Sequence, residues 1–148
     1  MLFGVDNLAA NRLGVKREPI TYKGRSIGIL VLVGAQLFIG AIHALFGVLL
    51  FSFGSDVLPA TYAYDVYTLA FGLLVCVFAW YIWQGKRAGW VGTVAVSVFV
   101  TVADALVVLG LPSIPGIPLF AAPTEIVYSI VVIGYLFTEK VRKKLGVS

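Results

Sequence analysis

The sequence predicts an all-α integral membrane protein, an up-down bundle of four transmembrane helices with both termini in the cytoplasm. Hydrophobic residues make up 60% of the 148 residues, charged residues only 12%, and the mean hydropathy is +1.00. The apolar residues gather in four runs, and every Lys and Arg lies outside them. A soluble domain of this size has too much surface to cover with so few charges. The composition therefore argues against a soluble enzyme.

Each run approaches or exceeds the length needed to cross a bilayer, because a core of about 30 Å takes about 20 residues of helix. The expected spans are about 27–51, 64–84, 88–111 and 123–138. The first contains no formal charge, and the fourth is the shortest. The chain is then a single membrane domain, 1–148, in which 1–26 form a basic cytoplasmic segment and 139–148 a basic cytoplasmic tail.

The basic residues set the orientation. Five of the 11 precede the first span, Lys86 and Arg87 lie between the second and third, and four follow the fourth. With four spans all three groups fall on one face, which the positive-inside rule makes cytoplasmic. The loops on the other face, about 52–63 and 112–122, contain no Lys or Arg. The second of them is rich in proline and is expected to be stiff and extended rather than helical. We expect a multi-pass protein of the plasma membrane.

Polar and small residues recur on one face of each span. We expect these faces to meet inside the bundle, with Leu, Val, Ile and Phe turned to lipid. The stripes are Gln36, Gly40, His43 and Gly47 on the first span, Asp65, Thr68, Gly72, Cys76 and Ala79 on the second, Thr93, Ser97, Thr101 and Asp104 on the third, and Glu125, Tyr128, Ser129 and Val132 on the fourth.

Two ionisable residues lie at one predicted depth. His43 is 16 residues beyond Ile27, and Asp104 is 16 beyond Ala88. At about 1.5 Å per residue both lie about 24 Å from the cytoplasmic boundary. An unpaired Asp near mid-membrane costs about 2.5–3.5 kcal/mol. We therefore predict a His43–Asp104 hydrogen bond or ion pair, which either locks two helices together or serves as a proton relay or ligand contact.

Asp65 and Glu125 begin their helices from the outer side, where the helix dipole favours a carboxylate. A sharper interpretation joins them to His43 and Asp104 in an outward-open acidic pocket, although their expected position is about 10 Å nearer the surface. A metal site is disfavoured because the chain has one His and no metal-binding motif. Cys76 is the only cysteine, so no internal disulfide forms, and no catalytic motif or cofactor is predicted.

Juxtamembrane cations are expected to contact anionic lipid headgroups, namely Lys86, Arg87, Lys143 and Lys144. No nucleic-acid-binding motif accompanies them. The leading interpretation is a non-catalytic structural or accessory subunit that packs with itself or with a larger membrane complex. The first alternative is a proton- or ion-coupled transporter or channel that titrates His43 and Asp104, with Gln36, Thr101 and Tyr128 lining its pathway. The second is a lipid- or quinone-binding membrane enzyme.

Overall fold

Five helices and one very short hairpin account for most of the chain in the computed structural model, which describes residues 21–22, 25–53 and 59–147. Strands β1 (Thr21–Tyr22) and β2 (Arg25–Ser26) pair antiparallel, with Thr21 opposite Ser26. The helices are α2 (Ile27–Phe53), α3 (Pro59–Trp83), α4 (Arg87–Val108), α5 (Ala122–Leu136) and α6 (Glu139–Lys144). The predicted basic segment up to residue 20 and the middle of the first outer loop, 54–58, lie outside the described residues.

The all-α class and the up-down packing are confirmed. Three helices, α2, α3 and α4, are long and apolar enough to cross a membrane. The fourth apolar helix, α5, has only 15 residues, or about 22 Å at 1.5 Å per residue. It ends early because Thr138 adopts an extended backbone before α6 begins.

The third span ends three residues before its predicted boundary. Gly110 adopts a positive φ of 68°, and the chain reverses there. The amide of Gly110 donates to Val107 O at 3.0 Å, and that of Leu111 donates to Leu106 O at 2.8 Å. This pair of bonds is the Schellman motif, which satisfies the last carbonyls of a helix. Beyond it, residues 109–121 form a series of turns and bends, so the proline-rich loop is non-helical as predicted but not extended.

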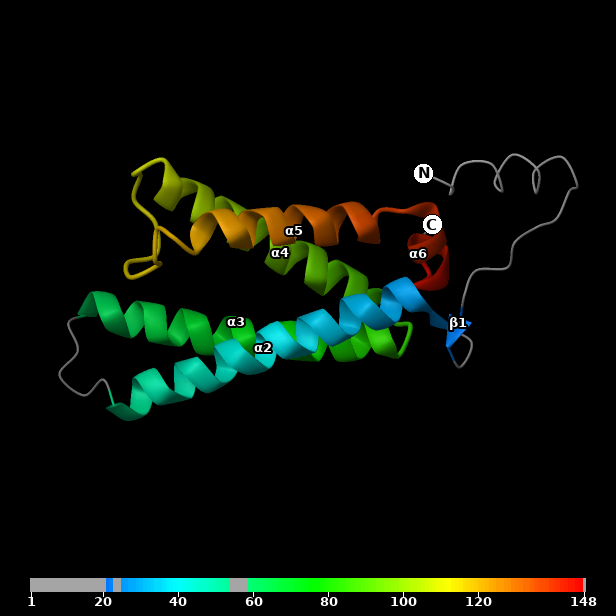
Figure 1. Ribbon diagram of the computed structural model, residues 1–148, viewed down its shortest axis with the longest axis horizontal. Coiled ribbons are helices and arrows are strands. Elements are labelled where there is room, and N and C mark those ends of the chain that lie inside the picture. Colours follow the sequence, from blue (N-terminus) through cyan, green and yellow to red (C-terminus); the bar gives the residue numbers. More distant parts are fainter. Residues whose placement is uncertain (1–20, 23–24, 54–58, 148) are drawn as a thin grey trace, which may run out of the picture.

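The helices form two antiparallel pairs (Figure 1). One pair is α2 with α3 and the other is α4 with α5, while α3 also packs against α4. The hairpin, the α3–α4 turn and α6 lie together at one end, which we call the α6 end. The loop 109–121 lies at the opposite end, the proline-loop end.

Close backbone approach holds α2 against α3. A Cβ added to Gly47 would lie 2.7 Å from the Cα of Leu69, and one added to Gly40 would lie 2.8 Å from the carbonyl oxygen of Gly72. Side chains at these positions would separate the helices, so the glycines allow the tight contact on which helix association in lipid depends. The small-residue stripes of the first two spans thus face each other.

The α6 end is filled by an apolar cluster, which we call the end core. It includes residues of the predicted tail, because Val141, Leu145 and Val147 are buried in it. The Trp90 Nε1 donates to Leu136 O at 2.9 Å and ties α4 to the end of α5 beside this cluster. The end core comprises Ile29, Leu32, Val33, Ala79, Ile82, Val132, Leu136, Val141, Leu145 and Val147. The bundle is therefore closed by hydrophobic packing at the α6 end.

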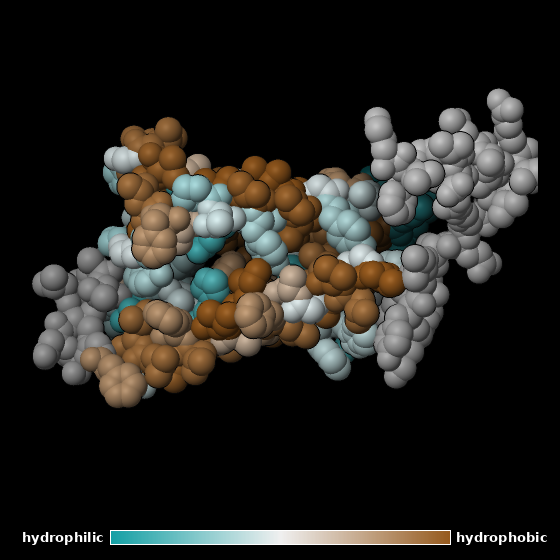
Figure 2. Space-filling model, in the orientation of Figure 1, coloured by the Kyte–Doolittle hydropathy of each residue, from teal (hydrophilic) through white to brown (hydrophobic). Residues whose placement is uncertain are grey.

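Outer and inner surfaces differ as the stripes predict. Large apolar side chains such as Phe38, Leu73 and Ile130 are exposed, as lipid-facing residues are. Figure 2 shows this apolar exterior, with hydrophilic residues visible in the hollow between the two helix pairs. The buried polar residues come from every one of the four apolar helices and are Gln36, Asp65, Thr68, Thr93, Ser97, Asp104 and Ser129.

Candidate functional site

His43 on α2 faces Glu125 on α5. The His43 Nδ1 lies 2.9 Å from Ile39 O, and because a carbonyl only accepts, this nitrogen carries a proton. The Nε2 is thereby turned toward the Glu125 carboxyl, 3.9 Å from Oε1. Both side chains remain partly exposed, at 25% and 31%. The contact joins the first apolar helix to the last, and it places one imidazole and one carboxyl within ion-pair distance but beyond hydrogen-bond distance.

Asp104 on α4 completes a group that we call the acid cluster, consisting of His43, Asp104 and Glu125. Asp104 is fully buried, with 0% exposure. Its carboxyl is in electrostatic contact with that of Glu125. Within the described part of the chain, neither of its oxygens forms a hydrogen bond of standard geometry, and the Glu125 carboxyl is the side chain close enough to form one. A buried carboxylate without a partner is costly, so this group requires a proton or a ligand.

The prediction that His43 pairs with Asp104 is therefore wrong, because His43 faces Glu125 instead. His43 Nε2 is turned to Glu125, and the Asp104 oxygens form no hydrogen bond with it. Glu125 also lies at the level of His43 rather than about 10 Å nearer the surface. The physical reason is the shortness of α5, whose first turn begins inside the bundle while α4 extends farther toward the proline-loop end (Figure 1).

Other buried polar atoms lack a partner as well. In the residues described here, six more side-chain atoms have no hydrogen-bond partner and almost no exposed surface, of which one, Arg142 Nε, is on α6. The other five come from the apolar helices α2, α3 and α5 and are Gln36 Oε1, Asp65 Oδ1, Tyr67 OH, Thr68 Oγ1 and Tyr128 OH. Buried polar groups in native proteins are normally paired with protein or with water. Their concentration in one bundle marks its interior as a polar site rather than a packed apolar core.

A chamber of about 290 Å³ opens at the acid cluster, with both His43 and Glu125 in its wall. Its other lining residues are Ile39, Phe71, Val100, Thr124, Tyr128 and Ser129. A small void of about 20 Å³ lies deeper, between Gln36, Thr93, Ser97 and Tyr128, which is room for one water molecule. Gln36 Nε2 lies 3.5 Å from Thr93 Oγ1 at this level. Polar groups thus continue from the chamber toward the middle of the bundle and stop at the end core.

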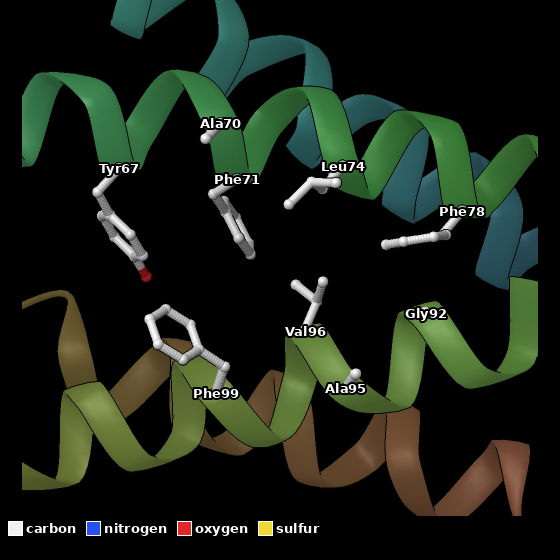
Figure 3. A pocket seen from close by; sticks show the side chains of 9 residues that line it. All are labelled: Tyr67, Ala70, Phe71, Leu74, Phe78, Gly92, Ala95, Val96 and Phe99. Carbon is white, nitrogen blue, oxygen red and sulfur yellow. The ribbon is translucent and has the colours of Figure 1, made fainter.

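An apolar groove of about 500 Å³ runs between α3 and α4 (Figure 3). Figure 3 shows the Tyr67 hydroxyl directed from α3 toward α4 at one end of this groove. The groove is lined by Tyr67, Ala70, Phe71, Leu74, Phe78, Gly92, Ala95, Val96 and Phe99. Phe71 belongs to the walls of the groove, the chamber and the small void. Its ring contacts those of His43, at 4.9 Å between centroids, and Tyr67, at 6.1 Å.

The remaining predicted site residues take separate positions. Thr101 Oγ1 donates to Ser97 O of its own helix at 2.8 Å and lines none of the three spaces described above. Asp65 is buried near the beginning of α3. Lys86 lies 5.2 Å from the Tyr81 ring centroid, and Arg87 begins α4. Lys143 pairs with Glu139 within α6, and Lys144 is exposed on the same helix. Across the described ranges, no three His, Cys, Asp or Glu side chains are placed to hold a metal ion.

Sequence reasoning missed Phe71 and the role of Tyr67. A phenylalanine in an apolar run has no signature that separates a lipid-facing ring from a cavity wall. A signal existed for Tyr67, because it lies one helical turn before Phe71 on the same helix. Tyrosine in an apolar span also brings a hydroxyl that needs a partner.

No protein-family model, curated protein or solved structure matches this chain. The chamber can hold a proton, water or a positively charged group, because the Glu125 carboxyl and the His43 imidazole line it and a second carboxyl, Asp104, lies within electrostatic range of Glu125.

Proposed function

We propose that the protein is a four-span plasma-membrane transporter, with both termini in the cytoplasm, that couples solute movement to protonation of the acid cluster. The observation that carries this proposal is the fully buried Asp104 carboxyl, which has no hydrogen-bond partner among the described residues. Ionisable residues inside a membrane bundle are costly and mark ion or substrate pathways. A structural role would be better served by a satisfied pair or by an apolar residue.

The distribution of charge supports the proposed orientation. Every described Lys and Arg lies at the α6 end, in the hairpin, the α3–α4 turn or the segment containing α6. The positive-inside rule places that end in the cytoplasm. The acid cluster is then separated from the cytoplasm by the end core and is reached from the outer side. Lys86, Arg87, Lys143 and Lys144 are exposed at the α6 end, where we propose that they contact anionic headgroups.

A flux measurement tests the proposed function. The full-length protein is reconstituted into liposomes that contain a pH-sensitive dye, and a proton gradient is imposed. We expect proton flux in the wild type and background flux in Asp104→Asn, which keeps the shape of the side chain and removes its charge. Glu139→Gln, which changes an exposed carboxyl on α6, is the matched control and should keep wild-type flux. Equal flux in the wild type and Asp104→Asn would refute the proposal.

A second candidate function, that of an oligomerising or accessory subunit, is favoured by two exposed glycines. A Cβ added to Gly34 on α2 or to Gly134 on α5 would meet no atom within 4 Å. Small residues on a lipid-facing surface permit close approach of another helix. If this is their role, Gly34→Ile lowers the fraction of dimer or larger complex seen by cross-linking in membranes, whereas Leu73→Ile on α3 leaves it unchanged.

A further inference from the structure

We propose that the groove between α3 and α4 and the chamber at the acid cluster form one site for a lipophilic organic cation, which enters sideways from the bilayer. The apolar body of the ligand occupies the groove, and its cationic group lies beside Glu125 and Asp104. This inference rests on the proposed function, because it names the substrate class of the same site. Three observations support it: one side chain lines both the groove and the chamber, the groove is lined by apolar residues, and the acid cluster has more carboxyls than imidazoles.

Phe71 is the shared wall. It lines the groove on one side and the chamber on the other, and its ring packs edge-on against His43 at 4.9 Å. On the groove side its ring stacks on that of Tyr67. The Tyr67 hydroxyl is buried and has no hydrogen-bond partner among the described residues. One aromatic side chain therefore lines both a hydrocarbon-like groove and the chamber that contains Glu125. The proposed site requires a change in the Phe71 rotamer to join the two spaces.

The groove suits an apolar body. Almost all of its accessible lining is carbon, because Tyr67 contributes the single polar side chain among its nine residues. Its rims are exposed at the surface of the bundle, where Leu74 and Phe99 are 45% and 56% accessible. Since these helices are long enough to cross a membrane, the groove faces lipid rather than water. Its volume of about 500 Å³ falls in the range of small-molecule sites, about 300–1,000 Å³.

The charge of the chamber selects a cation. Glu125 and the imidazole of His43 line the chamber, and the Asp104 carboxyl lies outside this lining but within electrostatic range of Glu125. One imidazole balances at most one of these two acids. The described Lys and Arg residues all lie at the α6 end, beyond the end core. An anionic group would be repelled there, and a neutral one would leave Asp104 without a counter-charge. A positively charged group completes the balance in a site of low dielectric, where such a pair is strong.

The bound cation replaces a proton. When a protonated acid cluster takes up one monovalent cation, one carboxylic proton leaves to solvent, and no covalent bond to carbon or phosphorus changes. Binding therefore weakens as the pH falls, because protons compete for the same oxygens. The titratable groups that line the chamber or the groove are His43 on α2, Tyr67 on α3, and Glu125 and Tyr128 on α5. Asp104 on α4 and Tyr64 on α3 line neither space but lie within electrostatic range of Glu125, and Asp65 lies within that of Tyr64.

Tetraphenylphosphonium and tetraphenylborate provide a matched pair of probes, because they have nearly the same shape and opposite charge. Their binding is measured on the full-length protein in nanodiscs of phosphatidylcholine, with empty nanodiscs as the blank. We expect saturable binding of tetraphenylphosphonium above the blank, with release of about one proton per ion bound in weakly buffered solution. Tetraphenylborate should show no saturable binding. Equal saturable binding of the two ions would overturn the inference.

Variants assign the binding to the groove and to the acid cluster. Ala95→Trp fills the groove and should weaken tetraphenylphosphonium binding about tenfold, the equivalent of about 1.4 kcal/mol. Leu73→Trp places the same ring on the exposed face of α3, outside the groove, and should leave binding unchanged.

Asp104→Asn should weaken binding at least about tenfold and abolish proton release. Glu125→Gln replaces Asp104→Asn if thermal unfolding shows that the latter does not fold. Unchanged binding in Ala95→Trp would place the ion elsewhere and overturn the proposed site.

Failure of this inference differs from failure of the proposed function. Asp104-dependent proton flux without tetraphenylphosphonium binding would overturn the lipophilic-cation site and leave proton coupling standing. Saturable, groove-dependent binding without proton flux in liposomes would overturn the transport function and support the site alone.

Discussion

Replacement of Gly47 by alanine tests whether backbone contact holds α2 to α3. The added Cβ would lie 2.7 Å from the Cα of Leu69 and 2.8 Å from its backbone nitrogen, whereas carbon atoms pack best at about 3.5–4.0 Å. Relief requires the helices to separate by about 1 Å, and a gap of that size already removes a quarter to a half of each contact energy. Because the obstructing atoms belong mainly to backbone, they cannot rotate away as a flexible side chain would.

We therefore expect Gly47→Ala to lower the free energy of unfolding by about 1–3 kcal/mol, the usual cost of overpacking. Gly34→Ala is the matched control, because its Cβ would meet no atom within 4 Å. Alanine should be neutral or slightly stabilising there, as in other exposed helix positions. The assay is equilibrium unfolding in mixed micelles with increasing sodium dodecyl sulfate, followed by loss of helical circular dichroism. Equal shifts of the midpoint in the two variants would refute the close-contact explanation.

Three further predictions concern charge, topology and the end core. Asp104→Asn should raise the free energy of unfolding by about 1 kcal/mol at alkaline pH, where the wild type must ionise a buried carboxyl without a described partner; a loss of stability in the same micelle assay at that pH would contradict this. A thiol introduced as Ser148→Cys, in a Cys76→Ser background, should resist impermeant maleimide applied outside intact cells, and labelling there would refute the cytoplasmic C terminus. Leu145→Ala should destabilise the protein by about 2–5 kcal/mol because Leu145 is only 1% exposed, whereas the exposed Lys140→Ala should change stability little.

Hydropathy and helical periodicity predicted most of the arrangement. The four apolar runs became four apolar helices, and the polar faces were placed correctly because a polar group inside lipid must turn toward protein. Gln36, Thr93 and Ser97, each chosen by spacing alone, are all buried. These features follow from the properties of one helix at a time, which is the information that a single sequence carries.

The partner of His43 depended on two helices together and was not predictable in the same way. Counting residues from the cytoplasmic boundary assumes that all helices have similar length and that the loops do not shift one helix along another. α5 has only 15 residues, and the turns before it bring Glu125 down to His43. The burial of Val141 and Leu145 was also missed, because a charged tail of ten residues was expected to remain in water. Their spacing of four places both on one helical face, which is the signal that was available.

The end core imposes an order on biogenesis. Its members come from the beginning of α2, the end of α3 and residues 132–147, so the apolar seal cannot form until residue 147 has left the ribosome. The α2–α3 pair can assemble earlier, since its glycine contacts involve neighbouring helices alone. Before residues 132–147 dock, the members of the end core on α2 and α3 lack their apolar partners from the last two helices, so closure of the α6 end is the last step of assembly.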